Sequence, residues 1–154
     1  MAIDDDIRPG RCWPFPGRAG QLGIKFPHPV VVTHISIDHV AKDIALDTTM
    51  QNAPRRFMVW GYSNSESRNF PSIHPPRSAP QPLIVDPNLT FLPIAMFRYE
   101  IHGPNHIQTF PILQEIATES FAFDGVVIEV LDNWGGETTC IYRVRVHGHL
   151  EDRN

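Results

Sequence analysis

Proline recurs throughout this chain, at fifteen of its 154 positions. Its ring clashes with the preceding turn of a helix and it has no backbone N–H to donate, so a proline ends or bends a helix. The share is about twice that of an average protein. We therefore expect strands that are joined by irregular loops, and no long helix.

The apolar residues between these prolines follow the period of β-strands. Ile35 and Ile37 alternate with polar neighbours, as in a strand with one buried face. Seven segments are predicted to be strands: Leu22–Phe26, Val30–Val40, Arg56–Tyr62, Phe91–His102, Ile107–Ile112, Phe121–Leu131 and Ile141–His149. Single helical turns are expected at 42–46 and 113–118. Many short strands favour an all-β fold, an antiparallel β-sandwich or jelly roll.

Two connections stand out among the predicted loops. The residues His-Gly-Pro-Asn at 102–105 indicate a turn, and they predict a hairpin between Phe91–His102 and Ile107–Ile112. The segment Ser63–Pro87 is polar and dense in proline, which predicts a long surface loop and not a second domain. We interpret residues 1–150 as a single domain.

The charge and hydropathy exclude several classes of partner. The net charge of -4 provides no basic field for nucleic acid or anionic lipid. No run of residues approaches the roughly eighteen apolar positions of a membrane span. The first ten residues lack the basic and apolar regions of a signal peptide. We interpret the chain as a piece of a longer protein.

The two cysteines, Cys12 and Cys140, stand near opposite ends of the chain. They are either two unrelated buried thiols, as in most cytosolic proteins, or a disulfide that joins the first loop to the last strand. In the chain-entropy account a disulfide across so long a loop contributes roughly 4–5 kcal/mol. The cysteines alone leave both interpretations open.

The eight histidines suggest a metal site only weakly. His147 and His149 have the spacing of two ligands on one strand face, and His102 and His106 form a second pair. No third ligand is recognisable near either pair, so surface histidines at loop ends are the favoured interpretation. No catalytic motif of a hydrolase, kinase or dinucleotide-binding enzyme is present, and we predict no catalytic residue. Asn88 begins a glycosylation sequon, a weak indication of a luminal location.

Three segments read together resemble the SUN domain family. They are PGRCWPF at 9–15 with glycines at 17 and 20, NAPRRFMVWG at 52–61, and NWG at 133–135 followed by TCIYRVRVHG at 139–148. The family patterns that they resemble are PGxCWxFxGxxG, SAPKxFxVxG and NWG…TCLYRxRVHG. The resemblance runs from Pro9 to Gly148, and the proline-rich stretch resembles an insertion.

The resemblance implies a function at the nuclear envelope. SUN domains are the luminal domains of inner-nuclear-membrane proteins of the LINC complex. In the perinuclear space they bind the C-terminal tail of KASH proteins of the outer membrane, and the pair connects the nucleus with the cytoskeleton. The resemblance therefore implies a KASH peptide as partner, a membrane anchor upstream, a homotrimer in the full protein and no enzymatic activity.

The resemblance also implies which residues form the peptide site. The pocket histidine of the family falls on His39, and its pocket tyrosine falls on Tyr142. A family serine is replaced by Asn52 and a family tyrosine by Thr138, and both replacements can still hydrogen-bond a carboxylate. Gly20, in the glycine pattern of the first segment, completes the predicted set.

The same resemblance pairs Cys12 with Cys140 as a disulfide, which suits a compartment continuous with the lumen of the endoplasmic reticulum. It also implies a monovalent-cation loop near Asp6, Arg11 and Tyr142 that would hold potassium or sodium. Arg11 stands where the family often has asparagine, and its charge would disfavour a cation if the side chain pointed inward.

The chain departs from the family pattern at its N-terminal side. The β-hairpin lid and the coiled coil of the family precede the first segment, and this chain begins too late to hold them. We therefore expect this chain alone to be monomeric and to bind peptide weakly. The alternative function is a luminal carbohydrate- or glycoprotein-binding jelly roll, in which Trp13, Trp60 or Trp134 would stack on sugar rings, although at least two of them are expected in the core.

Overall fold

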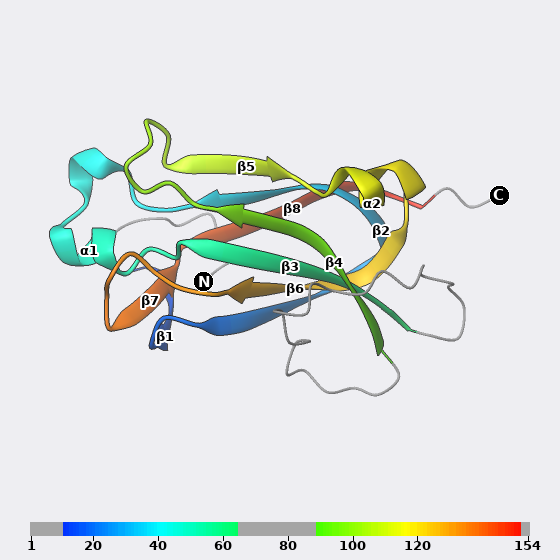
Figure 1. Ribbon diagram of the computed structural model, residues 1–154, viewed down its shortest axis with the longest axis horizontal. Coiled ribbons are helices and arrows are strands. Elements are labelled where there is room, and N and C mark those ends of the chain that lie inside the picture. The colour runs from blue at the N-terminus through cyan, green and yellow to red at the C-terminus, as the bar shows by residue number, and fades with distance from the viewer. Residues whose placement is uncertain (1–10, 65–88, 152–154) are drawn as a thin grey trace.

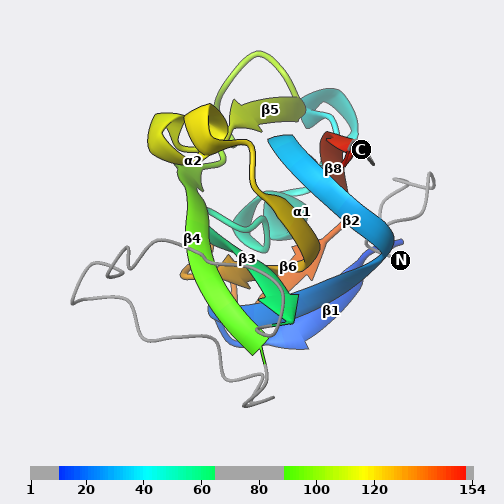
Figure 2. The same cartoon turned by 90° about the vertical axis from the view of Figure 1, so that its right-hand side faces the viewer.

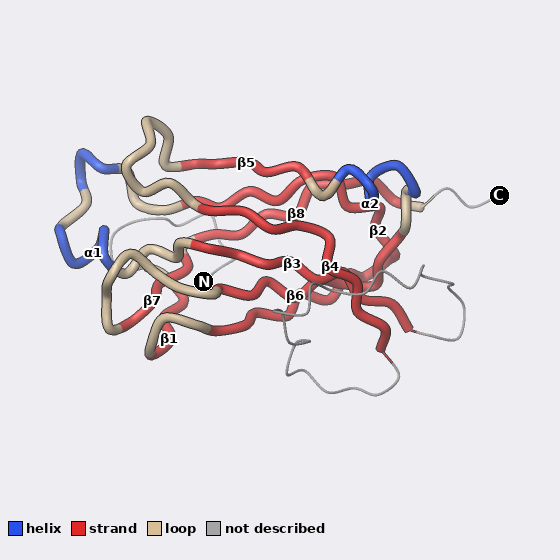
Figure 3. Tube along the Cα trace, in the orientation of Figure 1, coloured by secondary structure: helices blue, strands red, loops and turns tan. Residues whose placement is uncertain are grey.

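The computed structural model describes residues 11–64 and 89–151, and strands dominate this part of the chain (Figures 1 and 3). The strands are β1 (Trp13–Pro16), β2 (Gly20–Asp38), β3 (Arg56–Asn64), β4 (Leu89–Arg98), β5 (Ile107–Pro111), β6 (Ala122–Val130), β7 (Thr138–Ile141) and β8 (Arg143–Leu150). The helices are η1 (Lys42–Ile44), α1 (Asp47–Gln51) and α2 (Gln114–Glu119).

The long strand β2 joins the two layers of the fold. Its residues 20–31 pair with β6. On the other side β6 pairs with β3, and β3 pairs with β4. Residues 34–38 of β2 pair with β5 on one edge and with β8 on the other. The register against β6 shifts between Lys25 and Val30, a stretch with two prolines, which cannot donate to a sheet ladder. Figure 2 shows β2 passing from the layer of β3, β4 and β6 to that of β5 and β8.

One hydrophobic core fills the space between the layers. It draws buried side chains from the strands of both layers and from the connection after β4. Its fully buried members include Ile35, Ile37, Phe57, Val59, Ile94, Tyr99, Phe123, Val126, Ile128 and Ile141. Ile35 and Ile37 on β2 are two positions apart, as are Val126 and Ile128 on β6, which is the alternation of a strand. All pairings are antiparallel, so the predicted all-β sandwich is confirmed.

The predicted hairpin between the fourth and fifth strands is wrong. β4 pairs with β3, whereas β5 pairs with β2 in the other layer. The turn itself is present, because the backbone N–H of Gly103 donates to the carbonyl of Glu100 at 3.0 Å. The connection crosses between layers because Tyr99 and Ile101, 1% and 4% exposed, are buried in the core. Burial of these two side chains outweighs the local preference for a hairpin.

Other boundaries differ from the prediction in smaller ways. The two strands expected at 22–26 and 30–40 form the single strand β2, and the one expected at 141–149 is divided at Tyr142 into β7 and β8. The helical turns at 42–46 and 113–118 are confirmed as η1 and α2, and α1 was not predicted. The expected loop at 63–87 begins two residues late, since Ser63 and Asn64 pair with β4. The remainder of that loop lies outside the described residues.

Candidate functional site

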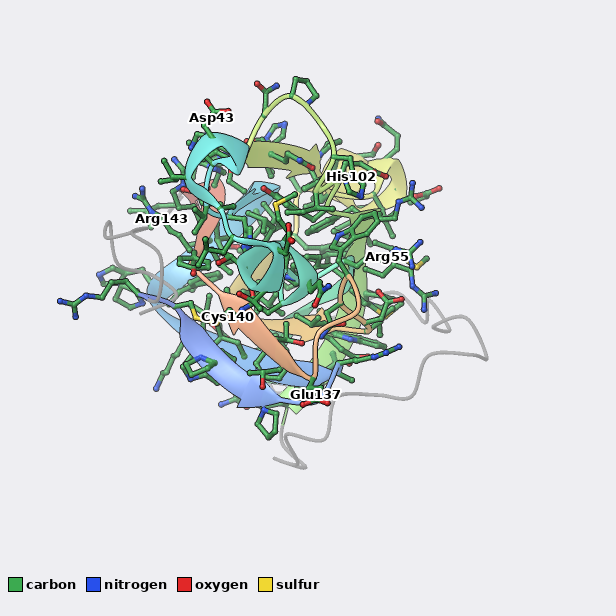
Figure 4. All side chains as sticks on the ribbon, turned by 90° about the vertical axis from the view of Figure 1, so that its left-hand side faces the viewer. Asp43, Arg55, His102, Glu137, Cys140 and Arg143 are labelled. Carbon is green, nitrogen blue, oxygen red and sulfur yellow. A yellow bond between two sulfur atoms is a disulfide. The ribbon has the colours of Figure 1, made fainter. Side chains whose placement is uncertain are left out.

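Four of the five residues predicted to bind peptide lie around α1, at one end of the sandwich. His39 contacts α1 through the carbonyl of Thr49, and Asn52 directly follows this helix. The carbonyl of Asn52 accepts a hydrogen bond of 2.9 Å from the N–H of Cys140 in β7, the strand that Thr138 begins. Figure 4 views this end, with α1 in teal at the centre and Cys140 beside β7. We define the candidate tail site by His39, Asn52, Thr138 and Tyr142.

His39 is a buried, neutral histidine. It follows β2 and has no exposed surface. Its Nε2 lies 2.8 Å from the carbonyl oxygen of Thr49, so Nε2 carries the proton and donates. Burial lowers the pKa of His39 to about 4, against a smaller opposing effect of this hydrogen bond. Its Nδ1, an acceptor in this tautomer, has no hydrogen-bond partner within the part of the chain that the structure describes.

Tyr142 packs directly against this histidine. The two ring centroids are 5.0 Å apart and the rings are perpendicular at 88°, an edge-to-face contact. Tyr142 is 2% exposed and forms a small cluster with Val40 and Cys140, against which Ala45 also packs. The residues predicted as the pocket pair therefore do meet. In this arrangement they form the wall of the site and present almost no surface of their own.

The disulfide of Cys12 and Cys140 holds this wall together. The two sulfur atoms are 2.00 Å apart, and the Cα atoms are 5.4 Å apart. Of the two interpretations that the cysteines left open, the disulfide is confirmed. Cys140 also pairs with Pro14 in the two-stranded sheet of β1 and β7. The covalent bond thus fastens this small sheet beside Tyr142.

Asn52 and Thr138 supply the more accessible polar groups. Asn52 is half-buried, and its backbone is fixed by hydrogen bonds to Thr48 and Cys140. Its Oδ1 is buried and lacks a partner among the described residues. Thr138 is exposed, and its carbonyl lies 3.4 Å from the side-chain amide of Asn133. An amide and a hydroxyl can both donate to a carboxylate, so this side of the site has donor capacity.

Gly20 has a packing role in this structure. A Cβ at this position would lie 2.7 Å from a ring carbon of Phe15, closer than carbon atoms approach one another. Gly20 begins β2 and pairs with Val130 of β6. The absence of a side chain therefore lets β1 fold over β2. A contact of Gly20 with a peptide stays a prediction.

A buried ion pair lies next to His39 and was not predicted. Asp38 is 2% exposed, and its Oδ1 accepts a hydrogen bond of 2.9 Å from Arg145. The guanidinium of Arg143 lies 3.8 Å from its other oxygen. Burial and the nearby carboxylate of Asp38 raise the pKa of Tyr99, whose hydroxyl donates to the carbonyl of His106 at 2.6 Å. In the sequence, the two arginines Arg143 and Arg145, two positions apart in the last strand, could have indicated a buried carboxylate partner.

A second unpredicted feature is a stack of three side chains on the other flank of α1. The Cζ atom of Arg55 lies 4.7 Å from the ring centroid of Trp134. The ring of His102 contacts the same indole, with centroids 5.3 Å apart at 77°. Figure 4 shows Arg55 and His102 on one side of α1 and Cys140 on the other. Arg55 and Trp134 belong to the segments that carry the family resemblance, so the motifs were the signal that could have located this stack.

Several predicted sites are not tested by the structure. Asp6 and Asn88 lie outside the described residues, and Arg11 is exposed. The monovalent-cation loop and the glycosylation site therefore stay predictions. Among residues 11–64 and 89–151, no three histidine, cysteine, aspartate or glutamate side chains are grouped so that they could hold a metal ion. His147 instead places Nε2 2.7 Å from the hydroxyl of the buried Ser36.

Within the described residues, no helix has the length and apolar character that crossing a membrane requires.

Comparisons with known proteins agree on one family. The family described as Sad1 / UNC-like C-terminal matches residues 1–75 and 84–150. The chain is 30% identical over 151 residues to SUN domain-containing protein 5 of Homo sapiens, covering 97% of the chain and 33% of that relative. It is 29% identical over 142 residues to the nuclear migration and anchoring protein unc-84 of Caenorhabditis elegans, covering 92% of the chain and 11% of that relative. The chain thus spans about a third or less of these relatives.

Solved structures share the fold with much lower sequence identity. A family 32 carbohydrate-binding module from Streptococcus pneumoniae EndoD matches with a TM-score of 0.55 at 11% identity, over 90% of this chain and 75% of that one. The SusE-like protein BT2857 matches with a TM-score of 0.55 at 12% identity, over 96% of this chain and 81% of that one. These two likenesses show the β-sandwich architecture alone.

Proposed function

The chain belongs to the Sad1 / UNC-like C-terminal family of SUN domain proteins, and on this basis we propose that it is a luminal peptide-binding domain. Its ligand is the C-terminal tail of a KASH-type protein of the outer nuclear membrane. The domain lies in the perinuclear space as part of an inner-nuclear-membrane protein, and the pair bridges the nucleus and the cytoskeleton. One relative is named a nuclear migration and anchoring protein, which is consistent with such a tether.

The observation that carries this proposal is the convergence of the candidate tail site. His39 and Tyr142 are about a hundred residues apart in the sequence, yet their rings are in edge-to-face contact. Asn52 and Thr138 approach the same end through α1 and β7. The four positions to which the resemblance assigned the pocket are therefore neighbours in the fold.

The chemistry of this end suits the end of a polypeptide. The amide of Asn52 and the hydroxyl of Thr138 are donors for a terminal carboxylate. Ile44 and Leu46, in η1 and directly before α1, are 60% and 69% exposed. Such exposed apolar side chains at one end are available to apolar residues of a bound tail.

The proposal includes a trimer, because the family implies a homotrimer with the peptide in a groove between neighbouring protomers. Light scattering of the longest natural polypeptide that carries this chain tests it. A monomer at micromolar concentration would contradict this part of the proposal and leave the tail site to be tested separately.

The direct test compares each candidate tail peptide with a free C-terminal carboxylate and as the C-terminal amide. We expect binding of the acid and loss of about tenfold or more in affinity for the amide, because charged hydrogen bonds are the strong ones. Isothermal titration calorimetry with the longest natural polypeptide measures both. Equal affinity of acid and amide would rule out the carboxylate assignment.

Matched variants locate the effect at the candidate tail site. Asn52→Ala and Thr138→Ala are expected to weaken binding of the acid and to leave the amide unchanged. Thr118→Ala, which changes an exposed threonine in α2, is the control and is expected to bind like the parent protein. If Thr118→Ala reduces affinity as much as Thr138→Ala, the tail does not bind at this end.

The carbohydrate-binding alternative gains no support of its own from the site. Trp60 is 1% exposed and cannot stack on a sugar ring in this conformation. Trp13 and Trp134 are partly buried against the core, and Trp134 already stacks with Arg55. A glycan array that gives saturable binding would revive this alternative.

A further inference from the structure

The guanidinium of Arg55 lies over an aromatic ring. Its Cζ atom lies 4.7 Å from the ring centroid of Trp134, within the range of a cation–π contact. Both side chains are half-buried. His102 contacts the same indole edge-on, with ring centroids 5.3 Å apart. A cation stacked in this way keeps its orientation while the edges of its plane remain available for hydrogen bonds.

The backbone fixes the position of both partners. The N–H of Arg55 donates to Asp132 at 2.9 Å, and its carbonyl accepts from Tyr99 at 2.7 Å. The N–H of Trp134 donates to Ala53 at 3.1 Å, and the indole N–H donates to the carbonyl of Tyr99 at 3.2 Å. Trp134 thus has no donor left for a ligand. Of the guanidinium and the indole, only the guanidinium therefore has donors for a ligand.

Among the described residues, the neighbouring arginines are paired and Arg55 is not. Arg56 forms an ion pair of 2.9 Å with Asp132, and Arg98 forms one with Glu100. The guanidinium of Arg55 makes no hydrogen bond or ion pair within residues 11–64 and 89–151, and its Nε is buried without a partner. Leaving a buried charged donor unpaired is unfavourable. The carboxylates of Asp132 and Glu100 already pair with Arg56 and Arg98, so neither of them neutralises Arg55.

We propose that Arg55, stacked on Trp134, is a binding subsite for a carboxylate group of a partner polypeptide. The fork of the guanidinium matches the two oxygens of a carboxylate in a planar, bidentate pair. The carboxylate comes from an acidic side chain or from a chain end, and the chemistry is the same. Arg55 follows Asn52 by three residues, so the subsite lies beside the candidate tail site. It does not depend on that site, and either can be correct alone.

The competing explanation is structural. In that case Arg55 only fastens the loop that contains Trp134, and any cation over the ring would serve. The two explanations differ in one respect. A purely structural contact requires only a positive charge at position 55 and the indole ring of Trp134. A carboxylate subsite also requires the planar N–H donors of the Arg55 guanidinium.

The test uses small probes and ¹H–¹⁵N NMR of the Arg55 Nε–H and the Trp134 indole N–H. The probes, at constant ionic strength, are N-acetyl-glutamate α-amide for a side-chain carboxylate, N-acetyl-glycine for a chain end, and N-acetyl-glutamine α-amide without a carboxylate. We expect saturable shifts of both signals with at least one carboxylate and none with the glutamine probe. Which carboxylate binds better identifies the source.

Three variants complete the experiment. Arg55→Gln is expected to abolish the saturable shift of the Trp134 signal, and Arg55→Lys is expected to weaken binding about tenfold because lysine lacks the fork. Arg56→Gln is the matched control and should bind like the parent, since Arg56 is paired with Asp132. Full binding by Arg55→Lys, equal loss in Arg56→Gln, or equal shifts with the glutamine probe would overturn the proposal.

Discussion

At the scale of single residues, two neighbouring titratable side chains are buried at the end of β2, and their surroundings differ. Asp38 and His39 are adjacent and almost completely buried. The carboxylate of Asp38 is paired with two arginines: Arg145 hydrogen-bonds to it and Arg143 lies close by. His39 has no such charged partner and is neutral, because transfer of a charge out of water is unfavourable. Substitution of its arginine partners therefore tests the role of Asp38, whereas a change of pH tests His39.

The first prediction concerns pH. The pKa of His39 is lowered from 6.5 to about 4, so between these pH values the unfolded chain binds a proton that the folded chain does not. Stability is therefore lost as the pH falls through this window, by up to about 3 kcal/mol. His39→Gln keeps a donor for the carbonyl of Thr49 and does not titrate. Urea unfolding at pH 7 and pH 4 should show the parent losing about 3 kcal/mol more than this variant. Parallel pH profiles would show that His39 is not the group responsible.

The second prediction concerns the ion pair. Arg145→Met removes the hydrogen-bonded partner of a carboxylate whose side chain is 1% exposed, so the free energy of unfolding should fall by about 3 kcal/mol. Arg56→Met breaks the pair with Asp132, in which the arginine is 59% exposed, and should cost about 1 kcal/mol or less. Denaturant unfolding of both variants measures the difference. Equal losses would mean that Arg143 alone compensates Asp38.

At the scale of elements, pairing between strands that are distant in the sequence determined the sheet topology more than the local turns did. β4 and β5 are consecutive strands with a turn between them, yet they lie at opposite ends of the six-stranded order β4-β3-β6-β2-β5, and β2 carries the sheet from one layer to the other (Figure 2). The strand expected at 141–149 is divided at Tyr142, whose ring packs against His39 outside the main core. β1 is four residues long and pairs only with β7 among the described strands. So short an element needs support beyond its backbone pairing, and the disulfide supplies it.

The third prediction is that the disulfide is a main support of this end. Its cysteines are 128 residues apart, and closing so long a loop in the unfolded chain contributes about 4–5 kcal/mol in the chain-entropy account. The variant with Cys12→Ala and Cys140→Ala should lose about that much in urea unfolding. Dithiothreitol should destabilise the parent and leave the variant unchanged. A loss below about 1 kcal/mol would assign the support of β1 to side-chain packing.

At the scale of the whole molecule, β2 makes one cooperative unit of the two layers. It is the single strand that pairs with both β6 and β8 in the described part of the chain. The core cluster includes Ile37 from the half of β2 that pairs with β5 and β8, and Ile128 from β6. Neither layer can separate without exposing that shared core to water. The candidate tail site at one end is therefore supported by a single cooperative unfolding unit.

The fourth prediction follows from this arrangement. Native-state hydrogen exchange should give the amides of Ile37 and Ile128 the same free energy of opening, equal to that of global unfolding. Thr118 in the short helix α2 should exchange through local opening at a much lower free energy. A free energy for Ile37 that is well below that for Ile128 would show that the layer of β5 and β8 opens separately.

The sequence by itself determined most of the strands, the fold class and the family, although β1 was not predicted. Alternation at Ile35 and Ile37 and the punctuation by proline are local properties, so they can be read without coordinates. The family motifs likewise pointed to His39, Tyr142 and the pair Cys12–Cys140.

Only the tertiary structure decided which strands pair, how far His39 and Tyr142 are buried, and where charges meet. These outcomes depend on residues that are distant in the sequence, such as Asp38 and Arg145, 107 positions apart, or Arg55 and Trp134, 79 positions apart. The local alternation of apolar residues carries no information about contacts between residues so far apart in the sequence. The free energy of burying a side chain or pairing a charge is set by the neighbours that the fold brings to it.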